Sequence, residues 1–145
     1  MRKELEQKLF ESYPELFKGR HEGLNKNLMG FGFECGDGWF NLINALSKHI
    51  TQHVELRREI DPSFDVIVFQ VKEKYGGLRF YCNGDDEVFA MIGLAEHLSE
   101  VTCEECGKPG ESAQAGYWLK TLCEDCIKGE FKDYEFTRNL KEKEI

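Results

Sequence analysis

Four cysteines near the C-terminus restrict what this chain can fold into more than any other feature. They form two C-x-x-C pairs, Cys103 with Cys106 and Cys123 with Cys126, separated by sixteen residues. This spacing lies in the range expected for a structural zinc site with four cysteine ligands. A C-x-x-C turn brings two sulfur atoms to one side of the backbone, and Gly107 suits the left-handed conformation that such a turn often requires. We therefore predict one structural Zn²⁺ ion held by the four thiolates.

Iron binding and thiol redox chemistry are the alternatives for these four cysteines. Redox C-x-x-C motifs normally occur singly beside a βαβ unit, and the sequence suggests no such unit. An ion with four protein ligands keeps no open position for substrate or water, so we expect a structural ion and not a catalytic one. Its role would be in folding, because a segment of about 25 residues cannot form a sufficient core alone.

The elements around the cysteines predict a treble-clef-like finger. A knuckle at the first pair is followed by a short hairpin, and the second pair starts a charged helix predicted from Glu124 to about Lys143. The positive end of the helix dipole favours thiolate charge there. We place this finger in residues 102–145. We expect it to dock on a body formed by residues 1–101, because almost no linker separates the two.

The body shows the periodicities of an α+β fold. Asp37 is a suitable N-cap for the longest helical pattern, in which Trp39, Leu42, Ile43, Leu46, Ile50 and Val54 form one stripe. Apolar residues at helical spacing predict three helices, over about 2–11, 39–59 and 86–100.

Two alternating apolar runs between the second and third predicted helices indicate a β-hairpin. They span about 64–74 and 78–82 and are separated by Gly76 and Gly77. A lone hairpin is only marginally stable, so we expect the finger's strands or a second subunit to complete a small antiparallel sheet. The inner face is predicted to carry Ile67, Phe69 and Val71 from one run and Leu78, Phe80 and Cys82 from the other.

The charge of the chain is unevenly distributed. The formal net charge is −8; residues 1–80 contain twelve basic and twelve acidic side chains, whereas residues 81–145 contain seven basic and fifteen acidic ones. The acidic half would repel a phosphate backbone, which argues against a DNA-binding finger. No apolar run reaches the roughly 18 residues that cross a bilayer, and the N-terminus lacks the apolar segment of a signal peptide. We therefore expect a cytoplasmic protein with reduced cysteines and no membrane contact.

Two segments of the body are candidate partner-binding surfaces. The Gly-rich stretch before the second helix contains Phe31, Phe33 and Trp39, which either anchor a partner or cap the core. On the outer face of the hairpin, a basic and aromatic group either binds single-stranded RNA or forms an ordinary solvated face. This second group consists of Lys72, Lys74, Arg79 and Tyr81.

The remaining histidines and cysteines give weaker signals. His49 and His53 are four residues apart on a helix, a spacing that can bind metal, but no third ligand is evident, so we expect an ordinary helix edge. Cys35 and Cys82 are expected to be small packing residues, with a catalytic cysteine–histidine pair as the alternative. The sequence has no phosphate loop, dinucleotide fingerprint or nucleophile elbow, so we do not expect an enzyme.

Three motifs together resemble those of a group of small proteins from bacteriophages, prophages and bacteria. They are the GDGW segment ending at Trp39, the VKEKYGGLRFY hairpin from Val71 to Tyr81, and the C-terminal cysteine pairs. In that group a GDGW segment, a VKEKFG-LRFY hairpin and a Cys-rich knuckle occur in the same order. The resemblance covers roughly residues 10–130 and implies a phage or mobile-element setting. The finger alone is similar to those of the DksA/TraR type, which bind RNA polymerase, although their long coiled-coil hairpin is missing here.

These observations predict a zinc-stabilised, non-enzymatic accessory protein encoded by a phage or prophage. We expect it to bind a host or phage protein in the host cytoplasm and so to modulate host transcription or defence. The alternative is an RNA- or DNA-binding accessory protein that uses the basic and aromatic face of the hairpin.

Overall fold

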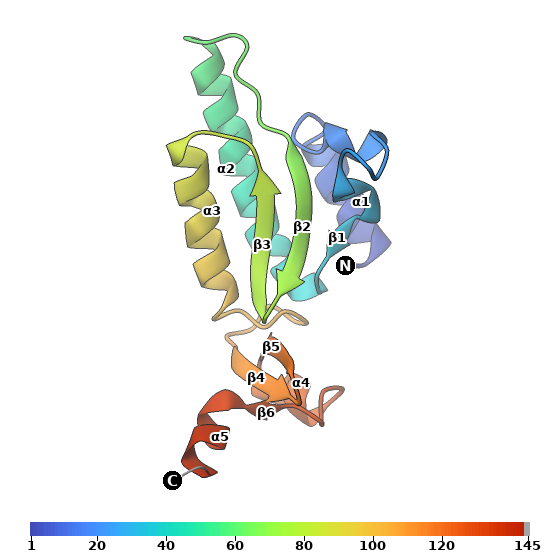
Figure 1. The fold of residues 1–145 in the computed structure, drawn as a ribbon, viewed down its shortest axis with the longest axis vertical. Coiled ribbons are helices and arrows are strands. Elements are labelled where there is room, and N and C mark those ends of the chain that lie inside the picture. Colours follow the sequence, from blue (N-terminus) through green and yellow to red (C-terminus); the bar gives the residue numbers. More distant parts are fainter. Residues whose placement is uncertain (144–145) are drawn as a thin grey trace.

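The computed structural model describes residues 1–143, and its fold is α+β as predicted. The last two residues of the predicted finger lie outside this range. A sheet of three strands and its helices form the body, and a second sheet of three strands lies in the finger at one end of it (Figure 1). Within residues 1–143, no helix has both the length and the apolar character needed to cross a membrane.

The body contains three α-helices, three strands and three short 3-10 helices. The predicted helices are confirmed to within two residues at each end, because their apolar spacing is strongly periodic. In chain order, the body elements are α1 (Lys3–Ser12), η1 (Lys18–His21), η2 (Leu28–Phe31), β1 (Phe33–Glu34), η3 (Asp37–Trp39), α2 (Phe40–Arg58), β2 (Val68–Lys74), β3 (Gly77–Cys82) and α3 (Asp86–Ser99). The finger elements are β4 (Glu111–Ala115), β5 (Trp118–Leu122), α4 (Glu124–Lys128), β6 (Glu135–Phe136) and α5 (Thr137–Lys143).

The third strand of the body sheet is β1, which lies in the stretch predicted as a Gly-rich loop. It runs parallel to β2, with Phe33 opposite Val71 and Glu34 opposite Lys72. The sheet order is β1-β2-β3, so the third strand comes from the body itself and not from the finger or a second subunit. The expectation of a purely antiparallel sheet was therefore wrong. A strand of two residues has no periodicity of its own, and its place depends on β2, far along the chain.

A β-bulge in β2 reverses the predicted orientation of part of this strand. The pairing with β3 shifts between Val68 and Gln70, so Phe69 is the extra residue. Val68 and Val71 are buried, whereas Phe69 is 41% exposed. Strict alternation does not survive such an insertion. The predicted inner face is confirmed for Val71, Leu78 and Phe80, and Cys82 packs against the core while partly buried. It is wrong for Ile67, which is half-buried before the strand, and for Phe69.

A single hydrophobic core fills the space between the body sheet and its helices. Phe17 is fully buried in it, with its ring centroid 5.2 Å from that of Phe33 and 6.4 Å from that of Phe80. Both contacts are edge-on, an arrangement that aromatic pairs prefer. The predicted stripe of α2 faces this core, with Trp39, Ile43, Leu46, Ile50 and Val54 buried and Leu42 partly buried.

Asp37 has a different role from the predicted one. The N-cap of α2 is Trp39, and no side chain caps this helix end. The Asp37 carboxylate instead accepts a hydrogen bond from the Arg2 amide (2.8 Å) and pairs with the Arg2 guanidinium group (2.6 Å). It thereby ties the start of α1 to the segment before α2.

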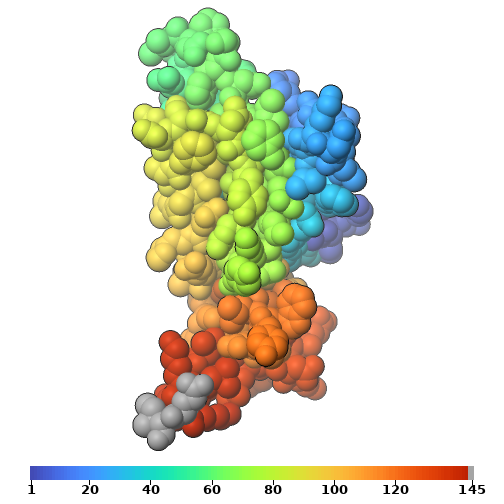
Figure 2. All heavy atoms as spheres, viewed as in Figure 1, coloured from blue at the N-terminus to red at the C-terminus, as the bar shows by residue number. Residues whose placement is uncertain are grey.

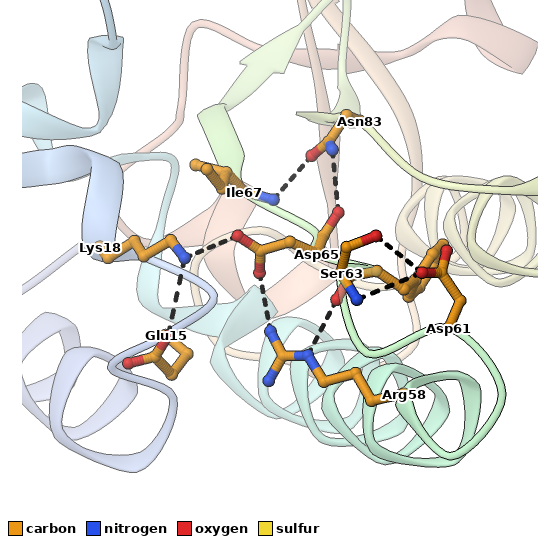
Figure 3. Close-up of polar contacts among 9 residues, drawn as sticks. Glu15, Lys18, Arg58, Asp61, Ser63, Asp65, Ile67 and Asn83 are labelled. Carbon is orange, nitrogen blue, oxygen red and sulfur yellow. Dashed lines mark hydrogen bonds and ion pairs between the residues drawn. The ribbon is translucent and has the colours of Figure 1, made fainter.

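One carboxylate holds the connection between α2 and β2. Asp65 pairs with Arg58 at the end of α2 (2.9 Å) and with Lys18 of η1 (2.6 Å), as Figure 3 shows. Asn83, just after β3, accepts a hydrogen bond from the Ile67 amide (2.7 Å) and donates one to the Asp65 carbonyl oxygen (2.9 Å). These contacts join segments far apart in the sequence at the end of the body that is remote from the finger (Figure 1).

The finger contains a sheet of order β5-β4-β6 and two short helices. α4 ends at Lys128, and the chain then passes through a turn to β6 and α5. The single charged helix predicted from Glu124 to about Lys143 was therefore wrong. The aromatic residues of that stretch explain the interruption, because they turn inward against the small core of the finger. They are Phe131, Tyr134 and Phe136, packed against Cys103, Ala113, Leu122 and Cys123.

Candidate metal centre and neighbouring surfaces

The four paired cysteines lie together in the finger. Cys103 and Cys106 come from the turn before β4, whereas Cys123 is the N-cap of α4 and Cys126 lies within that helix. Their sulfur atoms all lie within 4.8 Å of one another, and the Sγ atoms of Cys106 and Cys123 are 3.5 Å apart. All six cysteines of the chain are free thiols, so no disulfide competes for these sulfur atoms.

The spacing of the sulfur atoms fits a tetrahedral metal ion. With metal–sulfur bonds of about 2.3 Å, the edges of a zinc–sulfur tetrahedron measure about 3.8 Å, close to the spacing found here. A set of four thiolates suits Zn²⁺ or iron and does not suit Mg²⁺ or Ca²⁺, which prefer oxygen ligands. The cluster can therefore hold one metal ion. Such an ion would have four protein ligands and no open position.

The backbone around the cluster favours thiolate charge. The Cys126 amide donates a hydrogen bond to Cys123 Sγ (3.5 Å). Burial opposes ionisation of Cys123, but this hydrogen bond and the neighbouring thiols outweigh it and lower the pKa of the thiol to about 7. Gly107 has a φ of 78°, the left-handed conformation predicted after the first pair. Burial and the neighbouring thiols raise the pKa of Cys126, and burial raises that of Cys106, so without a cation Cys123 is the one of these three thiols that ionises readily. A bound cation would supply the charge that the other thiolates need.

The turn that carries Cys103 and Cys106, here called the first cysteine knuckle, packs on the glycines of the GDGW segment. The Gly38 amide donates a hydrogen bond to the Glu104 carbonyl oxygen (2.7 Å), and the Gly36 amide donates one to the Glu104 carboxylate (3.1 Å). A Cβ atom on Gly38 would lie 2.6 Å from both the Glu104 carbonyl oxygen and the Gly107 amide nitrogen. The absence of side chains therefore allows the knuckle to approach the body this closely.

Two further hydrogen bonds link the finger and the body. The Trp39 indole N–H donates to the Thr102 carbonyl oxygen (2.9 Å), and the Thr121 hydroxyl donates to the Gly76 carbonyl oxygen (2.7 Å). The finger therefore contacts both the segment before α2 and the turn between β2 and β3.

The three aromatic residues of the Gly-rich stretch have different environments. Phe33 and Trp39 are buried in the core, whereas Phe31 is 58% exposed. Core packing therefore accounts for two of the three rings, and the proposed anchoring role is wrong for Phe33 and Trp39 in this conformation. Only Phe31 stays a candidate for contact with a partner.

The predicted basic and aromatic group does lie on one face of the body sheet. Lys72 is directly opposite Arg79 on the neighbouring strand, and Tyr81 is opposite Gln70. Because paired residues of an antiparallel ladder point to the same face, these side chains share the face remote from the core. Lys74 follows at the end of β2 and is exposed.

A histidine and two carboxylates form a second polar cluster, at the start of α3. His53 Nε2 lies 2.8 Å from Asp85 Oδ2, and ligand atoms of His53, Asp85 and Glu87 lie within 4.8 Å of one another. Sequence reasoning missed this third group because Glu87 lies on another helix. Arg57 is 3.6 Å from the same Asp85 oxygen, and this cation opposes metal binding. We interpret the cluster as a tether between α2 and α3, and His49 is an exposed residue one turn away.

Replacing Asp85 with alanine is expected to destabilise the fold by about 1 kcal/mol, because its carboxylate caps α3 through the Val88 amide (3.0 Å). Burial raises the pKa of Asp85, but hydrogen bonds from His53 and the Val88 amide outweigh it, so the folded pKa lies below its ordinary value. The charged form therefore stabilises the fold above the unfolded pKa of about 3.9, and this stability is lost as the pH falls through the folded pKa.

Urea unfolding of the wild type, Asp85→Ala and Asp85→Asn, from about pH 3 to pH 7, tests this role. The asparagine side chain would still cap the helix, so the Asp85→Asn variant should keep more stability than the alanine variant at neutral pH. Both variants should lack the part of the stability that the wild type loses as the pH falls through the folded pKa of Asp85. Equal stability of all three proteins at neutral pH would contradict the assignment.

Cys35 and Cys82 lie in the body and behave as packing residues. Burial raises the pKa of the Cys35 thiol to about 12 and that of the Cys82 thiol to about 11. Both thiols are therefore protonated near neutral pH, which does not suit a nucleophile. This is the environment expected for the packing role that the sequence predicts.

Sequence reasoning missed an apolar groove between α2 and α3. Its volume is about 610 Å³, and its end is formed by residues near the cysteine knuckle. The available signal was the sequence of α3 and the residues just after it, where Phe89, Leu94 and Val101 are apolar but do not follow the spacing of the buried Val88, Ile92 and Ala95. The tip of the finger hairpin also exposes Tyr117 and Trp118. The lining of the groove includes Leu42, Ala45, Leu46 and His49 from α2, Met91, Leu94, Ala95 and Leu98 from α3, and Thr102 and Gly107 from the finger.

Comparisons with protein-family models, with curated proteins and with solved structures found no match to this chain. The resemblance to phage and bacterial proteins therefore rests on the three sequence motifs alone. The cysteine cluster supports the coarser statement, that the C-terminal segment is zinc-finger-like and can hold a metal ion.

Proposed function

We propose that this protein is a non-enzymatic protein-binding module stabilised by one structural Zn²⁺ ion. It would hold an apolar helix of a partner protein between α2 and α3. The observation that supports this most directly is the groove, whose lining is largely aliphatic and whose volume is about 610 Å³. Aliphatic grooves between paired helices are a recurrent way of binding an amphipathic helix.

The spacing of the lining residues favours a helical occupant. On α3 they follow a helical repeat through Met91, Leu94, Ala95 and Leu98, and α2 repeats the pattern through Leu42, Ala45, Leu46 and His49. These two stripes run side by side over about two turns, or roughly 10 Å of helix. Ridges of a third helix would fit between them.

The exposed apolar side chains of α3 support a protein partner. Leu94 is 63% exposed, Phe89 50% and Leu98 44%, and Val101 follows just beyond the helix at 54%. Of these, Leu94 and Leu98 lie in the lining of the groove, next to Met91 and Ala95. Contiguous exposed apolar surface marks interaction sites.

The cysteine cluster supports a structural role for the finger in this function. A Zn²⁺ ion held by four thiolates keeps no position for substrate, and the knuckle supplies Gly107 to the end of the groove. The metal would therefore act by holding the groove in shape. A phage or prophage origin, with a partner in host transcription or defence, follows from the motif resemblance and fits a binding protein of this size.

A pair of leucine substitutions tests the groove. Leu94 on α3 and Leu56 on α2 are both 63% exposed, but only Leu94 lines the groove. Wild type, Leu94→Glu and Leu56→Glu, each loaded with metal, are immobilised and challenged with host lysate. We expect the wild type and Leu56→Glu to retain the same stoichiometric protein and Leu94→Glu to retain at least tenfold less, because a charge cannot enter an apolar interface without cost.

The segment of the retained protein that binds is then identified and prepared as an isolated helix. A synthetic peptide of that helix should bind the wild type and Leu56→Glu equally and Leu94→Glu much more weakly in a titration. Equal retention by all three proteins, or the absence of any stoichiometric partner, would contradict the proposal.

A further inference from the structure

The outer face of the body sheet is not covered by any other part of the described chain. In Figure 2 the atoms of β2 and β3 form an open band between those of α3 and those of the N-terminal segment. Beside Gln70 and Glu34, this face carries a basic group and an aromatic group of side chains. The basic residues are Lys72, Lys74 and Arg79, and the aromatic ones are Phe69 and Tyr81.

The basic side chains of this face lack acidic partners. Within residues 1–143, no carboxylate lies within 4.0 Å of the charged group of Lys72, Lys74 or Arg79. The nearest acidic neighbour by register is Glu34, opposite Lys72, and its carboxylate accepts a hydrogen bond from Gln70. Glu100 also lies near Arg79, since both side chains approach Gly77, but it forms no ion pair with it. The basic groups of this face can therefore meet an anion.

The pairing of Lys72 with Arg79 is itself unfavourable for the isolated protein. The two residues lie directly opposite each other on neighbouring strands, where like charges repel and destabilise the sheet. An anionic ligand lying across both strands would relieve this repulsion. A negative partner is therefore complementary to the face.

The β-bulge determines which aromatic side chains this face displays. Regular alternation would turn Phe69 inward with Val71, but the extra residue leaves Phe69 41% exposed. Tyr81 is also 41% exposed, and at the end of the hairpin Tyr75 is 73% exposed beside Lys74, whose ammonium lies 5.6 Å from the ring centroid. Bulges commonly reorient a side chain at functional sites.

We propose that this face binds single-stranded nucleic acid. Unpaired bases can stack on Phe69 and Tyr81, while Lys72, Arg79 and Lys74 neutralise the phosphates between them. A duplex offers no free base faces, and the acidic side chains of a peptide supply charge but no aromatic ring to stack, so neither uses both kinds of side chain as single-stranded nucleic acid does. The chain as a whole carries a formal net charge of −8, so acidic surface elsewhere would repel phosphate and confine binding to this face.

Fluorescence anisotropy with the metal-loaded full chain tests the proposal. The probe is a labelled single strand of about 12 nucleotides of mixed sequence, as RNA and as DNA, at about 50 mM salt. We expect saturable binding that Lys72→Glu/Arg79→Glu abolishes and that Phe69→Ala and Tyr81→Ala each weaken about tenfold. With three phosphate contacts, the logarithm of the binding constant should fall with the logarithm of salt concentration with a slope of about −2.

The control is Lys8→Glu/Lys48→Glu, which makes the same change of charge at two exposed lysines of α1 and α2. It should retain most of the affinity, and a duplex of the same length should bind at least tenfold more weakly. Absence of binding at low salt, or equal loss of affinity in the control, would overturn the proposal. Binding that survives both aromatic substitutions would overturn it as well, because stacking would then play no part. The Leu94→Glu variant of the groove should bind the probe normally. The proposals for the groove and for the sheet face can therefore be tested independently.

Discussion

Removing the metal ion from the reduced, loaded protein is expected to unfold the finger and to lower the melting temperature of the body. The finger's own core contains only a few apolar residues around Ala113 and Leu122. A core of this size does not fold alone, whereas structural zinc sites contribute on the order of 10 kcal/mol of apparent binding free energy. Loss of the ion should therefore remove hydrogen-exchange protection from residues 102–143.

The body should remain folded but lose its contacts with the finger. Four of the hydrogen bonds described above link the two parts, from Gly36 and Gly38 to Glu104, from Trp39 to Thr102 and from Thr121 to Gly76. Each contributes about 1 kcal/mol, and for a body of about 100 residues each kcal/mol corresponds to about 4 °C. A fall of about 15 °C in the melting temperature of the body is therefore expected.

Elemental analysis and calorimetry, with and without a strong chelator, measure these effects. Two cysteine variants give matched controls. Cys103→Ala removes a proposed ligand and should lose both the metal and the finger's protection, whereas Cys82→Ala lies in the body and should keep one equivalent of metal. A reduced protein that contains no stoichiometric metal and melts identically in chelator would show that the cluster is not a metal site.

The parts of this structure that could be predicted from sequence depend on local patterns. The spacing of the cysteine pairs indicated their cluster, because each C-x-x-C turn is fixed by four consecutive residues. The repeat of apolar residues gave α2 and α3, and the two runs around Gly76 gave the hairpin. In each case the chemistry that determines the element lies within a few residues of it.

The parts that could not be predicted depend on contacts between distant segments. β1 is a strand only because Phe33 and Glu34 pair with β2, nearly forty residues later. The bulge at Phe69 depends on the register with β3, and no local signal distinguishes it from regular alternation. The predicted terminal helix failed for a related reason, since Phe131 and Tyr134 turn back to the finger's core.

The GDGW segment is a local pattern that the sequence shows, but its role depends on contacts with a distant segment. In the sequence its glycines indicate only a flexible segment or tight turns, and neither interpretation includes the cysteine knuckle that packs on them. The structure places Glu104 against Gly36 and Gly38, more than sixty residues away in sequence. A substitution at Gly38 should therefore change both the stability of the body and the affinity of the finger for metal.

Replacing Gly38 with alanine is therefore expected to destabilise the whole protein by about 3 kcal/mol, because the new methyl group would overlap backbone atoms of the knuckle. It would meet the carbonyl oxygens of Cys103 and Glu104 and the Gly107 amide nitrogen, the last two at 2.6 Å. Backbone atoms held by the cysteine turn cannot move aside as a flexible side chain can. The strain should also weaken metal binding, because it displaces the Cys103 turn.

Gly93 provides the matched control for this substitution. It lies in α3, and a Cβ atom there would meet nothing within 4 Å. Gly93→Ala should therefore stabilise the protein by roughly 0.5–1 kcal/mol, as expected for glycine in a helix interior. Denaturant unfolding of both variants, with competition for the metal by a chromogenic chelator, measures stability and metal affinity together. If Gly38→Ala matched the wild type in stability and in metal affinity, the knuckle could not pack on the GDGW segment as described. The proposed coupling between metal binding and the stability of the body would then be wrong.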